Sequence, residues 1–182
     1  MANYNVTILN GSGSQAMQKG TYNVTATATG YEGATLSPTT FTATENAGSQ
    51  AFTLTANGTL TLNVNETGAA GGTPITSGSI VMTDETGNTE YGQPITISAT
   101  GDAVFNNVPY GDAGTPFTLY FKQLTSDDNH NVFDGVISVQ MTGQTQTAYV
   151  QNTATAEQTF TLTDGTYGMP IENGSLNFTP NS

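Results

Sequence analysis

The 182-residue sequence has no cysteine, no arginine and a single histidine. The absence of cysteine excludes disulfides, thiolate metal sites and cysteine nucleophiles. Lys19 and Lys122 stand against 14 acidic residues, for a formal net charge of -12, so a phosphate backbone has almost nothing to pair with and we expect no nucleic-acid partner. Because His130 is the only histidine, and it lies in a polar, loop-like stretch, we expect no Ser-His-Asp triad. We expect no catalytic residue and no enzyme.

The sequence also lacks long apolar runs and helical periodicity. No apolar stretch is long enough to cross a bilayer. The first residues also lack the basic stretch followed by an apolar one that is typical of a signal peptide. We therefore expect no membrane insertion, and a chain that is either mature or not exported. Charged residues make up only 9% of the chain, and the apolar residues occur in short alternating groups. This pattern disfavours helix.

Short Thr-apolar-Thr-apolar segments recur throughout the chain, and Gly, Asn, Asp or Pro separates nearly all of them. A period of two directs one face to a core and the other to solvent, which is typical of a β-sandwich with short turns. We expect strands at residues 4–9, 21–28, 39–44, 51–55, 59–64, 79–83, 94–99, 103–108, 117–121, 135–141, 147–151, 159–163 and 175–179.

Two segments of the chain are internal repeats. The pattern Q-x-F-T-L-T occurs at residues 50–55 and 158–163, and P-I-x-x-G-S-(I/L)-x-(M/F)-T occurs at 74–83 and 170–179. The first copy continues into further strands, the second copy stops, and the N-terminus begins with strands typical of the later part of such a unit. We therefore divide the chain into an incomplete sandwich (1–57), a complete sandwich (58–164) and a C-terminal donor strand (165–182).

The order of P-I-x-x-G-S-I-x-M-T-D at 74–84, G-D-A-V-F-N-N-V-P-Y-G at 101–111 and F-T-L-Y-F at 117–121 resembles Cna B-type and carboxypeptidase-regulatory-like domains. So does G-x-Y-x-V-x-x-x-x-x-G-Y at 20–31. The resemblance implies an all-β fold of two tandem Ig-like or prealbumin-like sandwiches, and a structural or stalk module of the kind found in bacterial adhesins and pili. Many such domains carry a lysine isopeptide bond, but no lysine lies in the opening strand 59–64, so we expect none here.

One polar cluster offers oxygen ligands at alternating spacing. A hard cation such as calcium would favour it, but the sixth-position glycine and distal glutamate of an EF-hand are missing, so an ordinary polar loop competes with the metal site. In either case we expect His130, within this loop, to be solvated, and we expect no other cofactor. The candidate ligands are Asp127, Asp128, Asn129, Asn131 and Asp134.

A sandwich without its opening strand exposes an apolar groove and unpaired backbone groups. The C-terminal stretch can fill such a groove by strand complementation. Our leading hypothesis is a surface filament that assembles head-to-tail with copies of itself. The predicted donor contacts are Pro170, Ile171, Leu176 and Phe178, and the predicted acceptor residues are Tyr4, Val6, Ile8, Tyr22 and Val24.

Two alternatives remain open. One is a monomeric adhesin stalk or binding module at the cell surface, whose tail folds back on its own N-terminal part and whose partner is a host surface or a carbohydrate. The other is a phage virion decoration or fibre protein.

Overall fold

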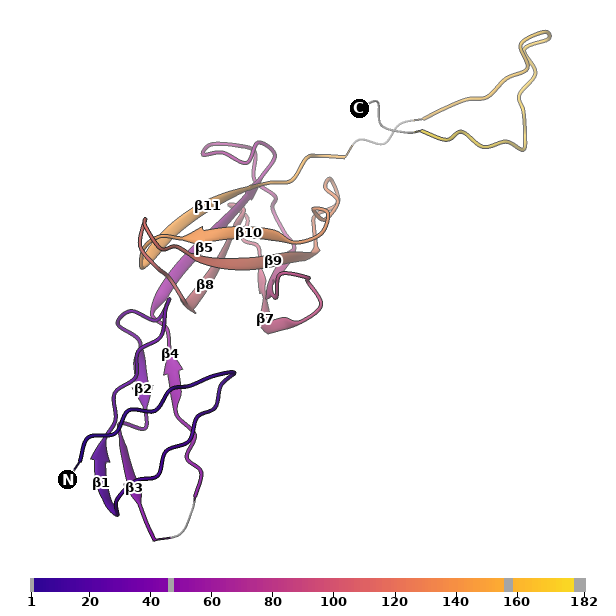
Figure 1. Cartoon of the computed structure of the whole chain (residues 1–182). Coiled ribbons are helices and arrows are strands. Elements are labelled where there is room, and N and C mark those ends of the chain that lie inside the picture. The colour runs from indigo at the N-terminus through magenta and orange to yellow at the C-terminus, as the bar shows by residue number, and fades with distance from the viewer. Residues whose placement is uncertain (1, 46–47, 156–158, 179–182) are drawn as a thin grey trace.

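The computed structural model describes residues 2–45, 48–155 and 159–178, and within these ranges the chain is all-β, as predicted (Figure 1). In the same ranges no helix is long and apolar enough to cross a bilayer. The strands are β1 (Gly20–Asn23), β2 (Thr35–Ser37), β3 (Thr40–Ala43), β4 (Thr53–Thr55), β5 (Gly58–Asn65), β6 (Ser79–Thr83), β7 (Glu90–Thr96), β8 (Asp102–Val108), β9 (Phe117–Thr125), β10 (Ile137–Met141) and β11 (Thr145–Gln151).

Strands β5 to β11 form a two-sheet sandwich. One sheet has the order β11-β5-β8 and the other the order β10-β9-β6-β7. The first two strands of this unit, β5 and β6, are therefore both inner strands, each paired on both sides. Strand β5 runs parallel to β11 and antiparallel to β8, whereas β6 is antiparallel to both β7 and β9.

The core lies between these two sheets. In β5 the alternation of apolar residues with Thr and Asn buries Leu60, Leu62 and Val64 completely, as a period of two requires. The Phe105 and Phe121 rings pack against each other with centroids 4.8 Å apart. The remaining buried apolar side chains of this core come from β6, β8, β9, β10 and β11, and from the segments around Ile75 and Ile97.

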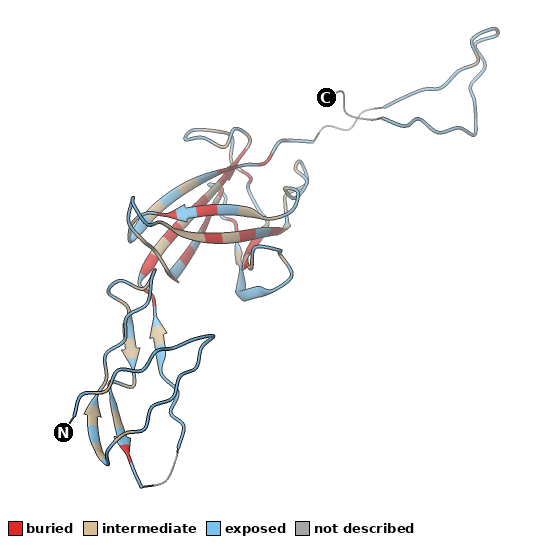
Figure 2. Ribbon diagram, viewed as in Figure 1, coloured by how far each residue is buried: buried red, intermediate tan, exposed pale blue. Residues whose placement is uncertain are grey.

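Residues 2–57, which we call the N-terminal module, bury little (Figure 2). Strand β1 pairs only with β3, and β2 only with β4, so the module contains two separate two-stranded ribbons. Among its described residues, only Gly30, Ala43 and Ala56 are buried. Isolated two-stranded ribbons are marginally stable in water, so this module depends on further contacts.

One set of those contacts joins the module to the sandwich. The Tyr110 backbone N–H donates to the Gly30 carbonyl oxygen at 2.8 Å, and the Tyr110 hydroxyl donates to the Glu32 carbonyl oxygen at 3.0 Å. Gly30 has a φ of +84°, and a Cβ placed there would lie 2.2 Å from the Phe117 ring. The turn at this glycine therefore fits closely against the start of β9.

The expected strands of the sandwich agree with the observed ones to within a few residues, but three other expectations are wrong. Residues 4–9, 159–163 and the described part of 175–179 are extended yet contain no strand, because their edges meet no ladder partner. Residue 179 lies outside the described residues. Strand β2 was not expected, since it is short and is followed by Pro38.

The described C-terminal segment, residues 159–178, lies on the opposite side of the sandwich from the N-terminal module (Figure 1). The sheet topology causes this separation. The N-terminal module precedes the start of β5, and the C-terminal segment follows the end of β11. Because β5 and β11 run parallel, the chain enters and leaves this sheet at opposite ends.

Candidate assembly site

The C-terminal segment is a hairpin-like loop with its own hydrogen bonds. Thr163 and Pro170 form an isolated antiparallel bridge. The Asp164 N–H donates to the Met169 carbonyl oxygen at 2.8 Å, and the Ile171 N–H donates to the Leu162 carbonyl oxygen at 3.0 Å. The Asp164 carboxylate also accepts hydrogen bonds from two backbone N–H groups in the turn. The loop therefore has a defined path.

The same hydrogen-bond pattern occurs in the sandwich, where β5 passes to the segment before β6. There Asn65 and Pro74 form the bridge. The Glu66 N–H donates to the Thr73 carbonyl oxygen at 2.9 Å, and the Ile75 N–H donates to the Val64 carbonyl oxygen at 3.0 Å. The C-terminal segment is thus a second copy of the β5–β6 unit with a shorter loop. In amino-acid sequence, residues 158–163 match residues 50–55, which include β4. In hydrogen bonding, residues 162–164 match the end of β5.

The two copies differ sharply in burial. Val64, Ile75 and Ile80 of the first copy are 0% exposed. Their counterparts in the second copy, Leu162, Ile171 and Leu176, are 38%, 44% and 45% exposed.

The apolar side chains of the second copy gather around a shallow hollow in which the Phe160 and Phe178 rings lie 4.6 Å apart. Of the predicted donor residues, Ile171, Leu176 and Phe178 line this hollow, and Pro170 holds the loop at its bridge. Phe160 and Leu162 also line this hollow but were not among the predicted donor residues, because their alternation was assigned to the last strand of the preceding sandwich. The signal that could have identified them is their place just before the second P-I pattern.

The predicted acceptor residues lie in the N-terminal module, and the structure brings two of them together. The Tyr4 and Tyr22 rings meet edge to face with centroids 5.6 Å apart, and both hydroxyls hydrogen-bond the backbone of Gln18. Val6 and Ile8 remain exposed, as does Phe52 beside β4. Val24 continues from β1, and its N–H donates to the Thr39 carbonyl oxygen.

The ribbons of the N-terminal module also leave strand edges open. Within the described residues β1 has a ladder partner on one side only, and so has β4. In the sandwich β5, β6 and β9 have partners on both sides, and the edge strands are β7, β8, β10 and β11. Unpaired edges of this kind accept an added strand. Two-stranded ribbons with open edges therefore lie at one end of the molecule, and exposed apolar residues of the second β5–β6 copy lie at the other.

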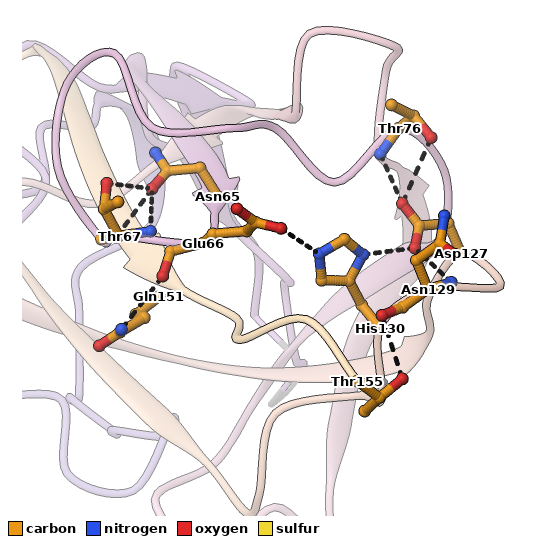
Figure 3. A network of polar contacts seen from close by, with 10 residues as sticks. Asn65, Glu66, Thr67, Thr76, Asp127, Asn129, His130, Gln151 and Thr155 are labelled. Atoms are coloured by element: carbon orange, nitrogen blue, oxygen red, sulfur yellow. Dashed lines mark hydrogen bonds and ion pairs between the residues drawn. The ribbon is translucent and has the colours of Figure 1, made fainter. Parts of the chain in front are cut away.

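The polar cluster around Asp127 forms a hydrogen-bonded latch (Figure 3). The Asp127 carboxylate accepts from the Thr76 and Asn129 N–H groups at 2.9 and 3.1 Å, and its Oδ1 lies 2.5 Å from His130 Nδ1. His130 Nε2 lies 3.4 Å from Glu66. The expectation of a solvated histidine is wrong, because these neighbours leave the His130 side chain only 6% exposed.

Hydrogen bonds set the protonation of this latch. Burial alone raises the pKa of the Asp127 carboxyl, but the hydrogen bonds from the Thr76 and Asn129 N–H groups and the His130 ring outweigh it and lower the pKa to about 2.

The calcium site remains a prediction. Among the described residues no group of three or more His, Cys, Asp or Glu side chains gathers around a common point. Asp127 directs its oxygens to protein donors. The other proposed ligands are Asp128, Asn129, Asn131 and Asp134.

Comparison with known proteins gives structural neighbours only. No family model and no curated protein matches the sequence. A minor pilin of Streptococcus agalactiae aligns at 9% identity with a TM-score of 0.46, over 66% of this chain and 61% of the pilin. The pilus 2b backbone protein of group B streptococcus aligns at 16% identity and 0.40, over 63% and 47%. The major pilin subunit of Bacillus cereus aligns at 14% and 0.37, over 57% and 32%.

These neighbours are pilins, the class of protein that the Cna B-type resemblance implies. The chain spans less than two thirds of the length of each. Because all three TM-scores are below 0.5, the alignments carry no argument about function. Any functional assignment rests on the geometry of the chain itself.

Proposed function

We propose that this protein is a structural subunit of a surface filament, and that subunits join head-to-tail by β-strand complementation. One observation carries the proposal: the C-terminal segment repeats the hydrogen bonds of the β5–β6 unit, while its apolar residues lie in solvent instead of in a sandwich core. A segment with the sequence of inner strands gains most by entering a sheet.

The acceptor is the N-terminal module of another subunit. Residues 152–158 separate β11 from the C-terminal segment and span at most about 25 Å when fully extended. To reach its own N-terminal module, the tail would have to run back along β5, which has 8 residues and a length of about 26 Å. The module lies beyond that point. The tail of one chain therefore reaches a neighbouring molecule more easily than its own N-terminal module.

Head-to-tail contacts of this kind are heterologous, and they produce open filaments or closed rings. An acceptor at one end of the sandwich and a donor at the other place successive subunits along a line. The proposal includes display at the cell surface, where such a filament would act as a stalk. Binding to a host surface or a carbohydrate would be a further property of the assembled fibre.

Deleting residues 167–182 tests the proposal. We expect the full chain to form multimers in light scattering and fibres in negative-stain electron microscopy, and the truncated chain to remain monomeric. Polymerisation of the truncated chain would overturn the proposal. A full chain that stays monomeric at high concentration would instead favour the stalk or binding module with an intramolecular tail.

A single substitution sharpens this test. Leu176→Asp places a charge on the apolar face of the donor, and Asn173→Asp places the same charge at a position whose counterpart in the sandwich, Ser77, is exposed. Burying an unpaired carboxylate is strongly unfavourable, so we expect Leu176→Asp to prevent assembly and Asn173→Asp to leave it largely intact. Both variants should retain the melting temperature of the sandwich, because neither residue belongs to its core.

A further inference from the structure

The N-terminal module corresponds to a sandwich from which two inner strands are missing. In the complete sandwich, removing β5 and β6 would leave the β9–β10 pair together with β7, β8 and β11 without inner neighbours. The module contains an antiparallel pair of the same kind, β1 with β3. It also contains β4, which precedes β5 as β11 precedes the C-terminal segment. Two extended segments, residues 4–9 and 13–19, come before them.

These two extended segments are joined by a tight turn, as β7 and β8 are, and each turn contains a glycine with a positive φ. Between β7 and β8 the chain reverses at Gly101, which has a φ of +83°, and the Gly101 N–H donates to the Ser98 carbonyl oxygen at 2.9 Å. Between residues 4–9 and 13–19 it reverses at Gly11, which has a φ of +78°, and Leu9 and Ser12 exchange backbone hydrogen bonds. We match residues 4–9 to β7 and residues 13–19 to β8.

The C-terminal segment supplies both missing strands. Residues 159–163 match β5, and residues 175–178 match β6, with the bridge at Thr163 and Pro170 between them. Because β5 and β6 belong to different sheets, the two donated strands belong to different sheets of the acceptor. A single donated strand would leave one of the two sheets incomplete.

Resting on the proposed function, we infer that each subunit donates two strands to a second copy of this chain. Residues 159–163 enter beside β4, parallel to it, with residues 13–19 on their other side. Residues 175–178 enter along the free edge of β1 and its continuation, with residues 4–9 on their other side. Leu162, Ile171 and Leu176 are then buried as Val64, Ile75 and Ile80 are in the sandwich.

Leu162→Asp in the full chain distinguishes two donated strands from one. If residues 159–163 enter a sheet, the new carboxylate is buried, and we expect assembly to weaken by more than about tenfold. Thr161→Asp is the matched control, because it adds the same charge to the opposite face of the same segment. Assembly of Leu162→Asp at the wild-type level would overturn the two-strand inference.

Cysteine pairs test the placement of each strand, and the absence of native cysteine makes every disulfide interpretable. In the parallel β5–β11 ladder Asn63 lies opposite Tyr149. Because Thr161 matches Asn63 of β5, and Thr53 of β4 is taken to match Tyr149 of β11, we expect Thr161 to lie near Thr53. Val81 lies opposite Lys122 in the β6–β9 ladder. Aligning Phe117 with Tyr22, the first large apolar residue of each strand, then places Asn177 near Thr27.

The cysteines are introduced into the full chain, and the assembled protein is oxidised mildly. For the first sheet Thr161→Cys is combined with Thr53→Cys or Thr55→Cys. For the second sheet Asn177→Cys is combined with a cysteine at position 25, 27 or 29, so that a shift of register is still detected. Thr161→Cys with Glu90→Cys, on the exposed strand β7, is the control.

We expect a ladder of covalent multimers from one pair in each sheet and none from the control. Multimers from the second sheet alone, together with normal assembly of Leu162→Asp, would overturn donation of two strands and leave the proposed function standing. Disulfides that form only within monomers in both sheets would overturn the intermolecular contact itself, and the proposed function with it.

Discussion

At the scale of single residues, one side chain, His130, is buried by contacts that its neighbours in the sequence do not reveal. His130 lies in a run of polar residues, and the sequence alone favours a solvated loop. The structure buries its ring between Asp127, from the same loop, and Glu66, from a distant part of the chain. Contacts between residues so far apart in sequence leave no local pattern, so neither the latch nor the burial of His130 could be predicted.

The Asp127 latch gives the sandwich a defined acid sensitivity. The carboxyl has a pKa of about 2 in the folded chain, below its ordinary value of 3.8. A depressed pKa contributes stability that is fully present above about pH 4 and is lost as the pH falls toward 2. We expect the melting temperature to fall across this window.

Asp127→Asn is the comparison for that fall, because its side chain cannot titrate. Thermal unfolding by circular dichroism should show a large melting-temperature difference between wild type and variant at pH 7, and a smaller one at pH 2. A difference that stays constant between pH 7 and pH 2 would contradict the role of the ionised carboxylate. Asp84, whose pKa is also lowered by hydrogen bonds from Thr89 and Thr86, titrates equally in both proteins.

At the level of elements, the sequence predicts strands well only where partners are present. The alternation in β5, β8 and β9 indicates both the strand and its buried face, and these strands lie where they were expected. Residues 4–9 and 175–178 show the same alternation but are not strands in the structure. Periodicity specifies a face, whereas a strand also needs a neighbouring backbone, and a single chain does not reveal a partner that another copy supplies.

The two copies of the P-I pattern offer a direct comparison of element stability. Ile75→Ala removes a fully buried side chain from the sandwich, and we expect it to lower the free energy of unfolding by about 2–5 kcal/mol. Ile171→Ala makes the same change in the exposed copy. In urea denaturation of dilute, unassembled protein, Ile171→Ala should unfold at the wild-type midpoint. An equal loss in both variants would show that the C-terminal segment is part of the core of its own chain.

In the assembled protein we expect Ile171→Ala to have an effect that it lacks in the monomer. Once residues 159–178 are buried in an acceptor, Ile171 occupies the environment that Ile75 already has. Ile171→Ala should then weaken self-association in sedimentation velocity while leaving the unfolding midpoint unchanged. Under the proposed assembly this contact forms only between subunits, so sequence patterns, rather than contacts within the monomer, point to this segment.

For the whole molecule, charge opposes the proposed assembly of apolar ends. Each subunit carries a formal net charge of -12, and the described C-terminal segment contributes Asp164 and Glu172 with no basic residue. Approaching subunits therefore repel each other. The Debye length is about 30 Å at 0.01 M salt and about 8 Å at 0.15 M, so moderate salt screens most of this repulsion without weakening apolar burial.

We therefore expect faster and more extensive assembly when sodium chloride rises from about 0.01 M to about 0.15 M, measured by light scattering at fixed protein concentration. Attraction between opposite charges would give the reverse dependence. Slower assembly with added salt would show that ion pairs, rather than buried apolar strands, hold neighbouring subunits together. The Leu176→Asp variant is the control, because its scattering should stay at the monomer level at both salt concentrations if salt acts through the donated strands.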